Sequence, residues 1–273
     1  TVLLYAHHDV QPVGDLELWN TEPFNPALKE GRLYGRGSGD NKAGVVVHYN
    51  VVKKLLHDLP VNIRIFIEGE EEIGSPTMSD FIEQNREALE ADVIVIADSA
   101  NVKIGVPTIT TTLRGLVDGF IEVDQPMRPV HSGMGGGIVP DAFMVLSKII
   151  ASFHDDEGNL RIEGLTPTEM NVAELDESYT KKMLGSEDIN LFDAESISKR
   201  LWLEPALDVL AIDAPPVDEA VNLVIPKAKA KISLRLPPTE DPEHAMKMLE
   251  KHVMKNIPWN ASVKFTPNSK GSG

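Results

Sequence analysis

The chain has 273 residues, and 42 acidic against 26 basic side chains give it a formal net charge of −16. Its length suits one large domain or two of ordinary size, and 42% hydrophobic residues suffice for a real core, which excludes disorder as a description of the whole. Nucleic acids and anionic membranes are poor partners for an acidic chain, because binding them requires clustered Lys and Arg. We therefore predict no nucleic-acid partner and no membrane partner.

The chain contains no cysteine. This excludes disulfides, thiolate metal sites and a cysteine nucleophile, so any metal ion must be held by His, Asp and Glu. The sequence also shows no secretory leader and no apolar run near the roughly 20 residues that a membrane helix needs. We expect a soluble, cytoplasmic protein.

Strand-like and helical patterns alternate in the first part of the chain. Apolar runs typical of strands lie at 1–6, 61–67 and 92–97, and helical patterns lie between them at 42–59 and 77–90. This alternation predicts an α/β domain with a mostly parallel sheet and flanking helices.

The pattern changes near residues 105–109. The predicted elements that follow are two strand-like stretches in 108–124, a helix over 139–153, a strand over 228–236, a helix over 242–254 and a strand over 261–265. We expect a smaller α+β domain over 108–273, after a first domain over 1–107.

The first candidate site comes where the opening strand ends, at His7 and Asp9. Open parallel sheets bind ligands beyond the carboxyl ends of their strands, and the His-x-Asp spacing points both side chains the same way. His7 is then a metal ligand, and Asp9 is the carboxylate that fixes its tautomer. By itself this pair is more typical of a polar strand end than of a metal site.

A glycine-rich segment, 35–44, leads into the first predicted helix and contains Asp40. It is not a phosphate-binding P-loop, because Lys42 is followed by Ala43 instead of Ser or Thr. Asp40 is either a metal ligand or an ordinary helix N-cap.

Acidic side chains follow two further strands: Glu71 and Glu72 come after 61–67, and Asp98 comes after 92–97. A charged run is often only a solvated face. Two adjacent carboxylates can also have different roles: one binds metal, and the other, with a raised pKa, acts as a general base. Because four predicted strand ends of one sheet each deliver His, Asp or Glu, a metal centre is favoured over four independent caps.

Four blocks of the sequence, 5–12, 33–42, 68–75 and 129–133, resemble the signature blocks of a di-zinc exopeptidase family. That family contains carnosine dipeptidase, carboxypeptidase G, aminoacylase and succinyl-diaminopimelate desuccinylase, and the dipeptidase branch is the most similar. The blocks occur in family order. The resemblance implies a zinc-exopeptidase catalytic domain, incomplete, over 1–107 and a dimerisation (lid) domain over 108–273.

The resemblance also implies a ligand set for two divalent metal ions. His7 and Asp98 bind one ion, Glu72 binds the second, and Asp40 bridges the two. Zinc is the expected metal, with manganese or cobalt as alternatives, because carboxylate-rich sites accept several ions.

Four residues receive other roles from the resemblance. Asp9 orients His7, and Glu71 is the general base. Arg235 holds the substrate carboxylate, and His131 reaches across from a partner subunit to polarise the scissile carbonyl. The implied enzyme is a homodimer, formed through the smaller domain, whose substrate is a small peptide.

The sequence departs from the family pattern at two points. Asn41 stands where most members have a second Asp. After Arg235 the remaining histidines are His244 and His252, and neither sits in the context of the family's late metal-ligating His. We therefore expect an incomplete second metal site. We also expect this chain to be a fragment of a longer enzyme, since family sequence on both sides of it is absent.

Three functions fit these observations. The first is metal-dependent hydrolysis of the amide bond in dipeptides or small peptides with a free carboxylate, towards which the block 9–12 leans. The second is an N-acyl amino acid amidohydrolase or desuccinylase, which shares the metal core. The third is a catalytically silent module that serves only in dimerisation or binding.

Overall fold

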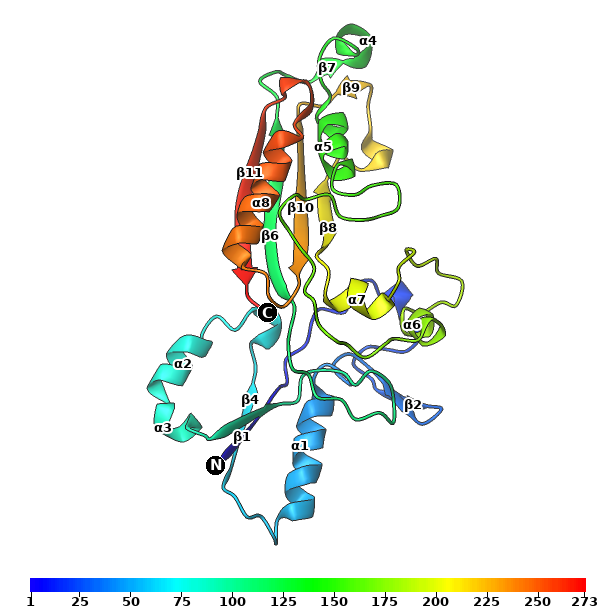
Figure 1. The fold of residues 1–273 in the computed structure, drawn as a ribbon. Coiled ribbons are helices and arrows are strands. Elements are labelled where there is room, and N and C mark those ends of the chain that lie inside the picture. Colours follow the sequence, from blue (N-terminus) through cyan, green and yellow to red (C-terminus); the bar gives the residue numbers. More distant parts are fainter. The chain divides into compact units, whose positions relative to one another are not determined.

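A computed structural model describes residues 1–273, which divide into two compact units, Thr1–Thr108 and Ile109–Gly273. Each unit has its own sheet and helices (Figure 1). The second unit is the longer, so our expectation of a smaller second domain is wrong for this chain. None of the helices combines the length and apolar character needed to cross a membrane.

The first unit is built on a three-stranded parallel sheet in the order β4-β1-β5. Its strands are β1 (Val2–His7), β4 (Ile63–Glu68) and β5 (Val93–Ile96). This confirms the predicted parallel sheet. The register pairs His7 with Glu68, so the carboxyl ends of these strands and the segments that follow them meet at one edge.

One long helix, α1 (Lys42–Leu55), packs against β1. It ends earlier than the predicted residue 59, and a hydrogen-bonded turn from Leu55 to Asp58 follows it. Buried His48 anchors the helix to the sheet, with its Nε2 atom 2.8 Å from the carbonyl oxygen of Tyr5.

The single helix predicted over 77–90 is wrong. The structure has two short helices, α2 (Met78–Gln84) and α3 (Arg86–Leu89), separated at Asn85. The Asn85 amide side chain donates to the Phe81 carbonyl at 2.8 Å, and its backbone has left the helical region at φ −120°. A side chain that competes for a helix carbonyl in this way favours a break. Phe81 stacks on Phe66 of β4 at 5.2 Å.

A small hairpin lies between β1 and α1. It consists of β2 (Ala27–Lys29) and β3 (Arg32–Tyr34), joined by Glu30 and Gly31 with φ of 50° and 75°. Two successive positive φ values make the turn that best matches the twist of a two-residue hairpin. Two single-turn 3₁₀ helices, η1 (Leu16–Leu18) and η2 (Glu71–Ile73), complete the unit.

The second unit has a four-stranded antiparallel sheet in the order β11-β6-β10-β8. Its strands are β6 (Gly115–Asp124), β8 (Ala206–Asp213), β10 (Lys227–Leu236) and β11 (Val263–Gly271). The segment 108–124 holds one strand, β6, instead of the predicted two, and the Thr108 hydroxyl closes a turn with Val102 and Val106 before it. Sequence reasoning did not predict β8.

Two helices, α5 (Ala142–Ala151) and α8 (Pro242–Lys255), pack on β6 and its two neighbours and cover one face of this sheet (Figure 1). Between helices and sheet lies the core, with Ile121, Phe153, Ile232 and Leu249 all fully buried. The remaining elements are β7 (Val130–His131), α4 (Ser132–Gly135), α6 (Glu177–Met183), α7 (Ile197–Trp202), η3 (Val217–Glu219), β9 (Leu223–Val224) and η4 (Pro258–Asn260).

Candidate metal centre

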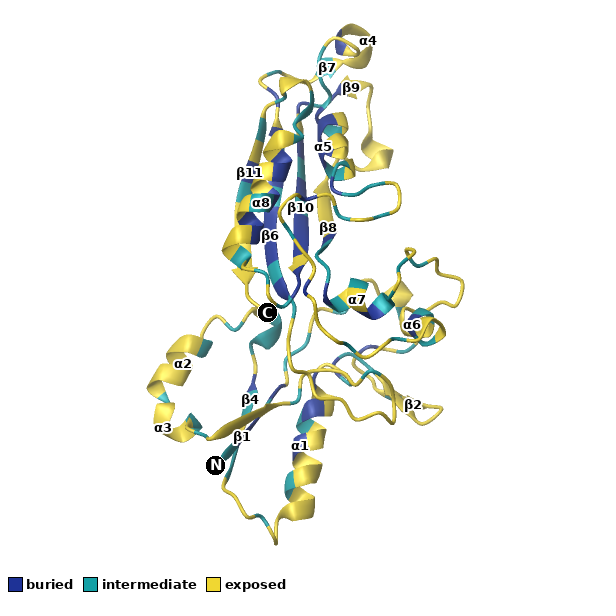
Figure 2. Cartoon of the chain, in the orientation of Figure 1, coloured by how far each residue is buried: buried dark blue, intermediate teal, exposed yellow.

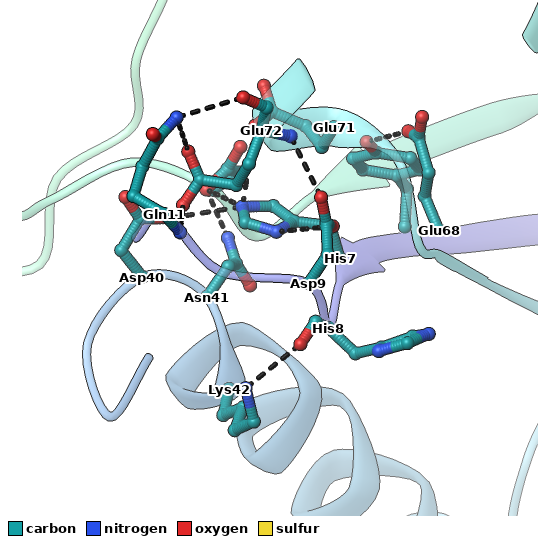
Figure 3. Close-up of polar contacts among 12 residues, drawn as sticks. His7, His8, Asp9, Gln11, Asp40, Asn41, Lys42, Glu68, Glu71 and Glu72 are labelled. Atoms are coloured by element: carbon teal, nitrogen blue, oxygen red, sulfur yellow. Dashed lines mark hydrogen bonds and ion pairs between the residues drawn. The ribbon is translucent and has the colours of Figure 1, made fainter. Parts of the chain in front are cut away.

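The four predicted metal ligands and the predicted general base, Glu71, meet at the carboxyl edge of the parallel sheet. Figure 3 shows this group around His7. His7 is the last residue of β1, while Glu71 and Glu72 lie on the turn after β4 and Asp98 follows β5. Asp40 comes from the segment between β3 and α1, outside this sheet. Our expectation of four strand ends in one sheet is therefore wrong in that detail, and three strand ends and one loop supply the residues.

His7 is the centre of this group. Its side chain is buried, and its Nε2 atom lies 3.1 Å from Asp40 Oδ1, 3.6 Å from Asp98 Oδ1 and 3.8 Å from Glu71 Oε2. Two sets of three ligand atoms fall within 4.8 Å of one another: His7 with Glu71 and Asp98, and His7 with Asp40 and Glu72. The cluster contains one imidazole and four carboxylates.

Asp9 faces the other side of the His7 ring. Its Oδ1 atom is 3.3 Å from His7 Nδ1, and neither atom has another polar partner. Its Oδ2 atom accepts the backbone N–H of Glu72 at 3.0 Å. Burial opposes ionisation of Asp9, but the Glu72 amide and His7 outweigh it and hold the pKa of this carboxyl below its ordinary value. An ionised Asp9 fixes the proton of His7 on Nδ1 and leaves Nε2 free for the cluster.

The cluster concentrates negative charge around one buried ring. Burial lowers the pKa of His7, but the charges of Asp98, Glu71 and Asp40 prevail, so its pKa is raised. Burial raises the pKa of Glu71, and the neighbouring carboxylates add to this against the opposing effect of His7. Glu71 is thus the carboxylate of the group with a raised pKa, as a general base requires.

Asn41 does not cap α1, and neither does Asp40, so the N-cap alternative for Asp40 is wrong. Asn41 occupies the cap position without a capping hydrogen bond from its side chain. Its buried amide instead donates to Asp98 Oδ1 and, at 2.9 Å, to the carbonyl oxygen of Ala97. A second Asp at this position has no such proton to offer unless it is itself protonated. Asn41 therefore orients Asp98.

Gln11 is a member of the site that sequence reasoning missed. Its backbone N–H donates to Glu72 Oε1 at 3.3 Å, and its amide donates to Glu72 Oε2 and the Glu72 carbonyl oxygen, both at 2.9 Å. Two amide groups thus hold one carboxylate (Figure 3). The sequence did offer one signal for Gln11: it lies two residues beyond Asp9, in the same polar segment after the first strand.

Glu68 lies beside the centre in sequence but does not join it. Its buried carboxylate accepts the Tyr5 hydroxyl at 2.5 Å. This hydrogen bond supplies the partner that a buried carboxylate needs. The acidic turn therefore divides into Glu68, which binds Tyr5, and the pair Glu71 and Glu72, which faces His7.

The residues of the cluster fit divalent metal ions. Imidazole nitrogen and carboxylate oxygen are ligands of zinc, manganese and cobalt, and each set offers three such atoms within 4.8 Å of one another. A bound cation would also offset the like charges of the four carboxylates. His7 offers a single free nitrogen, so one imidazole serves one ion, and carboxylates alone would hold a second.

A family model described as "Peptidase family M20/M25/M40" matches residues 3–255. The chain belongs to this peptidase family. The match confirms the family resemblance carried by the four sequence blocks. The chain is 34% identical to a cysteinylglycine-S-conjugate dipeptidase of Corynebacterium striatum, over 97% of this chain and 60% of that protein. It is 32% identical to the beta-Ala-His dipeptidase of Homo sapiens, over 93% of this chain and 53% of that protein.

Solved structures of the M20 peptidases have the same fold. An M20 family metallo-carboxypeptidase from Sulfolobus solfataricus superposes with a TM-score of 0.78 at 29% identity, covering 98% of this chain and 65% of that one. Human carnosine dipeptidase 1 gives 0.73 at 28% identity, covering 98% and 60%. The chain therefore spans less than two thirds of the length of these relatives.

The two other predicted site residues, His131 and Arg235, lie in the second unit. His131 is exposed at the end of β7, where its Nδ1 atom accepts the backbone N–H of Gly133 at 3.1 Å. This contact leaves the proton on Nε2, so that Nε2 can act as a donor. Arg235 is exposed on β10.

Proposed function

We propose that this chain carries the metal centre of a dipeptidase that hydrolyses the amide bond of dipeptides or small peptides with a free carboxylate. The supporting observation is the gathering of His7 with Asp40, Glu71, Glu72 and Asp98 at one sheet edge. The relatives, a cysteinylglycine-S-conjugate dipeptidase and beta-Ala-His dipeptidases, favour this substrate class over N-acyl amino acids.

Two divalent metal ions, zinc in the first place, belong to this proposal. As the family resemblance implies, His7 and Asp98 would hold one ion, Glu72 would hold the other, and Asp40 would serve both; all four lie in the ligand groups of the cluster. When bound, such ions polarise a carbonyl and lower the pKa of a water molecule towards neutrality. The protein's own contribution is to hold these ligands in place, through Asp9 on His7, Gln11 on Glu72 and Asn41 on Asp98.

Glu71 moves the proton. Its carboxylate takes a proton from the attacking water and delivers it to the departing amine, for which a raised pKa is suited because the group must both accept and release. No side chain of the protein needs to act as a nucleophile in this scheme.

The second unit completes the proposed enzyme. Arg235 binds the free carboxylate of the substrate through its planar pair of donors. His131 donates from Nε2 to the oxygen of the scissile carbonyl, where negative charge develops. In this proposal 1–107 is the catalytic domain, 108–273 is the dimerisation and lid domain, His131 acts on the site of a partner subunit, and the homodimer is cytoplasmic.

The test is hydrolysis of a dipeptide panel and an N-acetyl amino acid panel by the purified chain, with added zinc or manganese and with chelator. Glu71→Gln is expected to lower the rate by a factor of about 10² to 10⁴, which is the usual contribution of a general base. The matched control is Glu70→Gln in the same turn, because Glu70 accepts hydrogen bonds from Thr77 and lies outside the ligand sets.

Chelator-sensitive cleavage of dipeptides that depends on Glu71 supports the proposal. Faster cleavage of N-acetyl amino acids overturns the dipeptide class in favour of an amidohydrolase. Metal binding without cleavage of either panel overturns the activity for this chain and leaves a silent module.

A further inference from the structure

Two arginines lie at the same end of the antiparallel sheet. Arg235 is on β10, where it pairs in register with Leu116 of β6 on one side and with Ala206 of β8 on the other. Arg114 directly precedes β6, two residues before Leu116. Arg235 lies between Leu234 and Leu236, which are fully buried in the core beneath α5 and α8. Because side chains alternate along a strand, Arg235 points to the opposite, open face of the sheet.

Arg114 is a partly buried charge with few partners. Its Nη2 atom donates to the carbonyl oxygen of Glu204 at 3.4 Å, and its buried Nε atom has no hydrogen-bond partner. An unpartnered buried donor costs free energy, and more so when the group is charged.

The two guanidinium groups act on each other. Burial, and next the positive charge of Arg235, hold the pKa of the Arg114 guanidinium below its usual range. Asp208 of β8 is the carboxylate that acts against this effect. The sequence has 42 acidic and 26 basic side chains, yet neither arginine forms an ion pair with a carboxylate. Like charges placed together in this way are relieved by an anion.

We propose that Arg114 is a second substrate-binding arginine, and that it forms with Arg235 a two-guanidinium site for the free carboxylate of the substrate. This rests on the proposed function, to which it adds Arg114 and a strict requirement for a free acid. Arg235 presents its planar pair of donors to the carboxylate. The Arg114 guanidinium adds a second positive charge and further N–H donors beside the same group.

Kinetics on a dipeptide and its C-terminal amide give the first test. Arg114→Gln is expected to raise KM for the dipeptide at least about tenfold, since a hydrogen bond to a charged group is lost, and to leave kcat within about twofold. KM for the amide is expected to stay unchanged. The matched control is Arg161→Gln, an exposed arginine elsewhere in the same unit. Equal weakening of the dipeptide and the amide, or no effect on either, overturns the proposal.

A second test does not depend on activity. In chelator, the side-chain Nε–H resonance of Arg114, assigned by its loss in Arg114→Lys, is followed by NMR as glycylglycine or glycylglycinamide is added. The proposal expects a shift with the acid and none with the amide, even if the chain hydrolyses nothing. No shift with glycylglycine overturns it.

Thermal unfolding separates this role from a structural one. Without ligand, Arg114→Gln is expected to unfold at the same or a higher temperature, because the substitution removes an unpaired charge. A lower midpoint in Arg114→Gln that Arg114→Lys restores would assign Arg114 to the fold and overturn its role as a substrate-binding residue.

Discussion

The two units differ in what holds them together. The second unit has a continuous core in which Val117, Ile121, Phe153, Ile232 and Leu249 are fully buried. In the first unit the buried hydrophobic side chains are those of Leu3, Leu4 and Ala6, and every residue of β5 is exposed, with values from 43% to 62% (Figure 2). The predicted chemistry of the metal centre lies in the unit with the smaller core.

This difference shows how the metal centre is supported. The sheet places His7 and the turn after β4 through the backbone hydrogen bonds of paired strands, and amides from Gln11 and Asn41 then hold the carboxylates. These are polar contacts, in contrast to the apolar core of the second unit. The stability of the first unit is therefore expected to depend on a bound cation, whereas that of the second depends on its core.

The sharpest test of the comparison is truncation of one apolar side chain in each unit. Leu249→Ala is expected to cost about 2–5 kcal/mol of the free energy of unfolding of the second unit, because it leaves a cavity in a closed core. Ile94→Ala on β5, where the side chain is 60% exposed, is expected to stay within about 0.5 kcal/mol. Urea unfolding followed by hydrogen exchange of each unit measures both. Comparable losses would contradict the difference between the units.

The next largest effect is expected from added metal, which should stabilise the first unit and not the second. Zinc or manganese at about one hundred times its dissociation constant stabilises the state that binds it by about 2.7 kcal/mol. The free energy of opening measured by hydrogen exchange should rise by that amount in β1 and β4 and remain unchanged in β6 and β10. In His7→Ala the rise in β1 and β4 should vanish. Equal protection of both units would show that the metal acts elsewhere.

A smaller effect is expected from the amides around the ligands. Gln11→Ala removes the donors that hold Glu72 and should weaken metal binding by a factor of about 10 to 100, the usual contribution of such supporting contacts. Calorimetric titration of zinc measures this. Gln84→Ala, on exposed α2, is the control and should bind zinc as the parent does. Unchanged affinity in Gln11→Ala would remove Gln11 from the site.

The smallest effect expected is the pH dependence that His252 gives to the second unit. His252 is buried on α8, stacks on Phe153 at 5.0 Å, and has its Nε2 atom 3.1 Å from the Ser152 carbonyl oxygen. Burial, helped by Lys255, holds the pKa of His252 below its ordinary value, although Ser152 and Glu163 oppose this.

The folded state therefore binds the His252 proton less tightly than the unfolded state does. This contribution to stability is intact above the ordinary histidine pKa of about 6.5 and is lost as the pH falls through the lower folded value. Exchange protection of α8 should decline between pH 7.5 and 5.5 in the parent chain and less steeply in His252→Gln. Equal slopes would contradict the assignment.

Much of the fold could be predicted from local pattern. The apolar runs of β1, β4 and β5, the periodicity of α1 and α8 and the paired acids at 71–72 each carry their signal within a few residues. Strand β8 could not be predicted in this way. It is an edge strand whose residues from 208 to 213 are all exposed, so no alternation of buried and exposed side chains marks it.

The sequence by itself determined the residue types of the metal centre, because only His, Asp and Glu were available as ligands and each followed a recognisable strand or glycine-rich turn. The tertiary structure alone decided which polar groups meet: Gln11 with Glu72, Asn41 with Asp98, and Arg114 near Arg235. These pairs join residues far apart in the chain, and only the pairing of strands and the course of the loops bring them together. Local periodicity carries no information about such contacts.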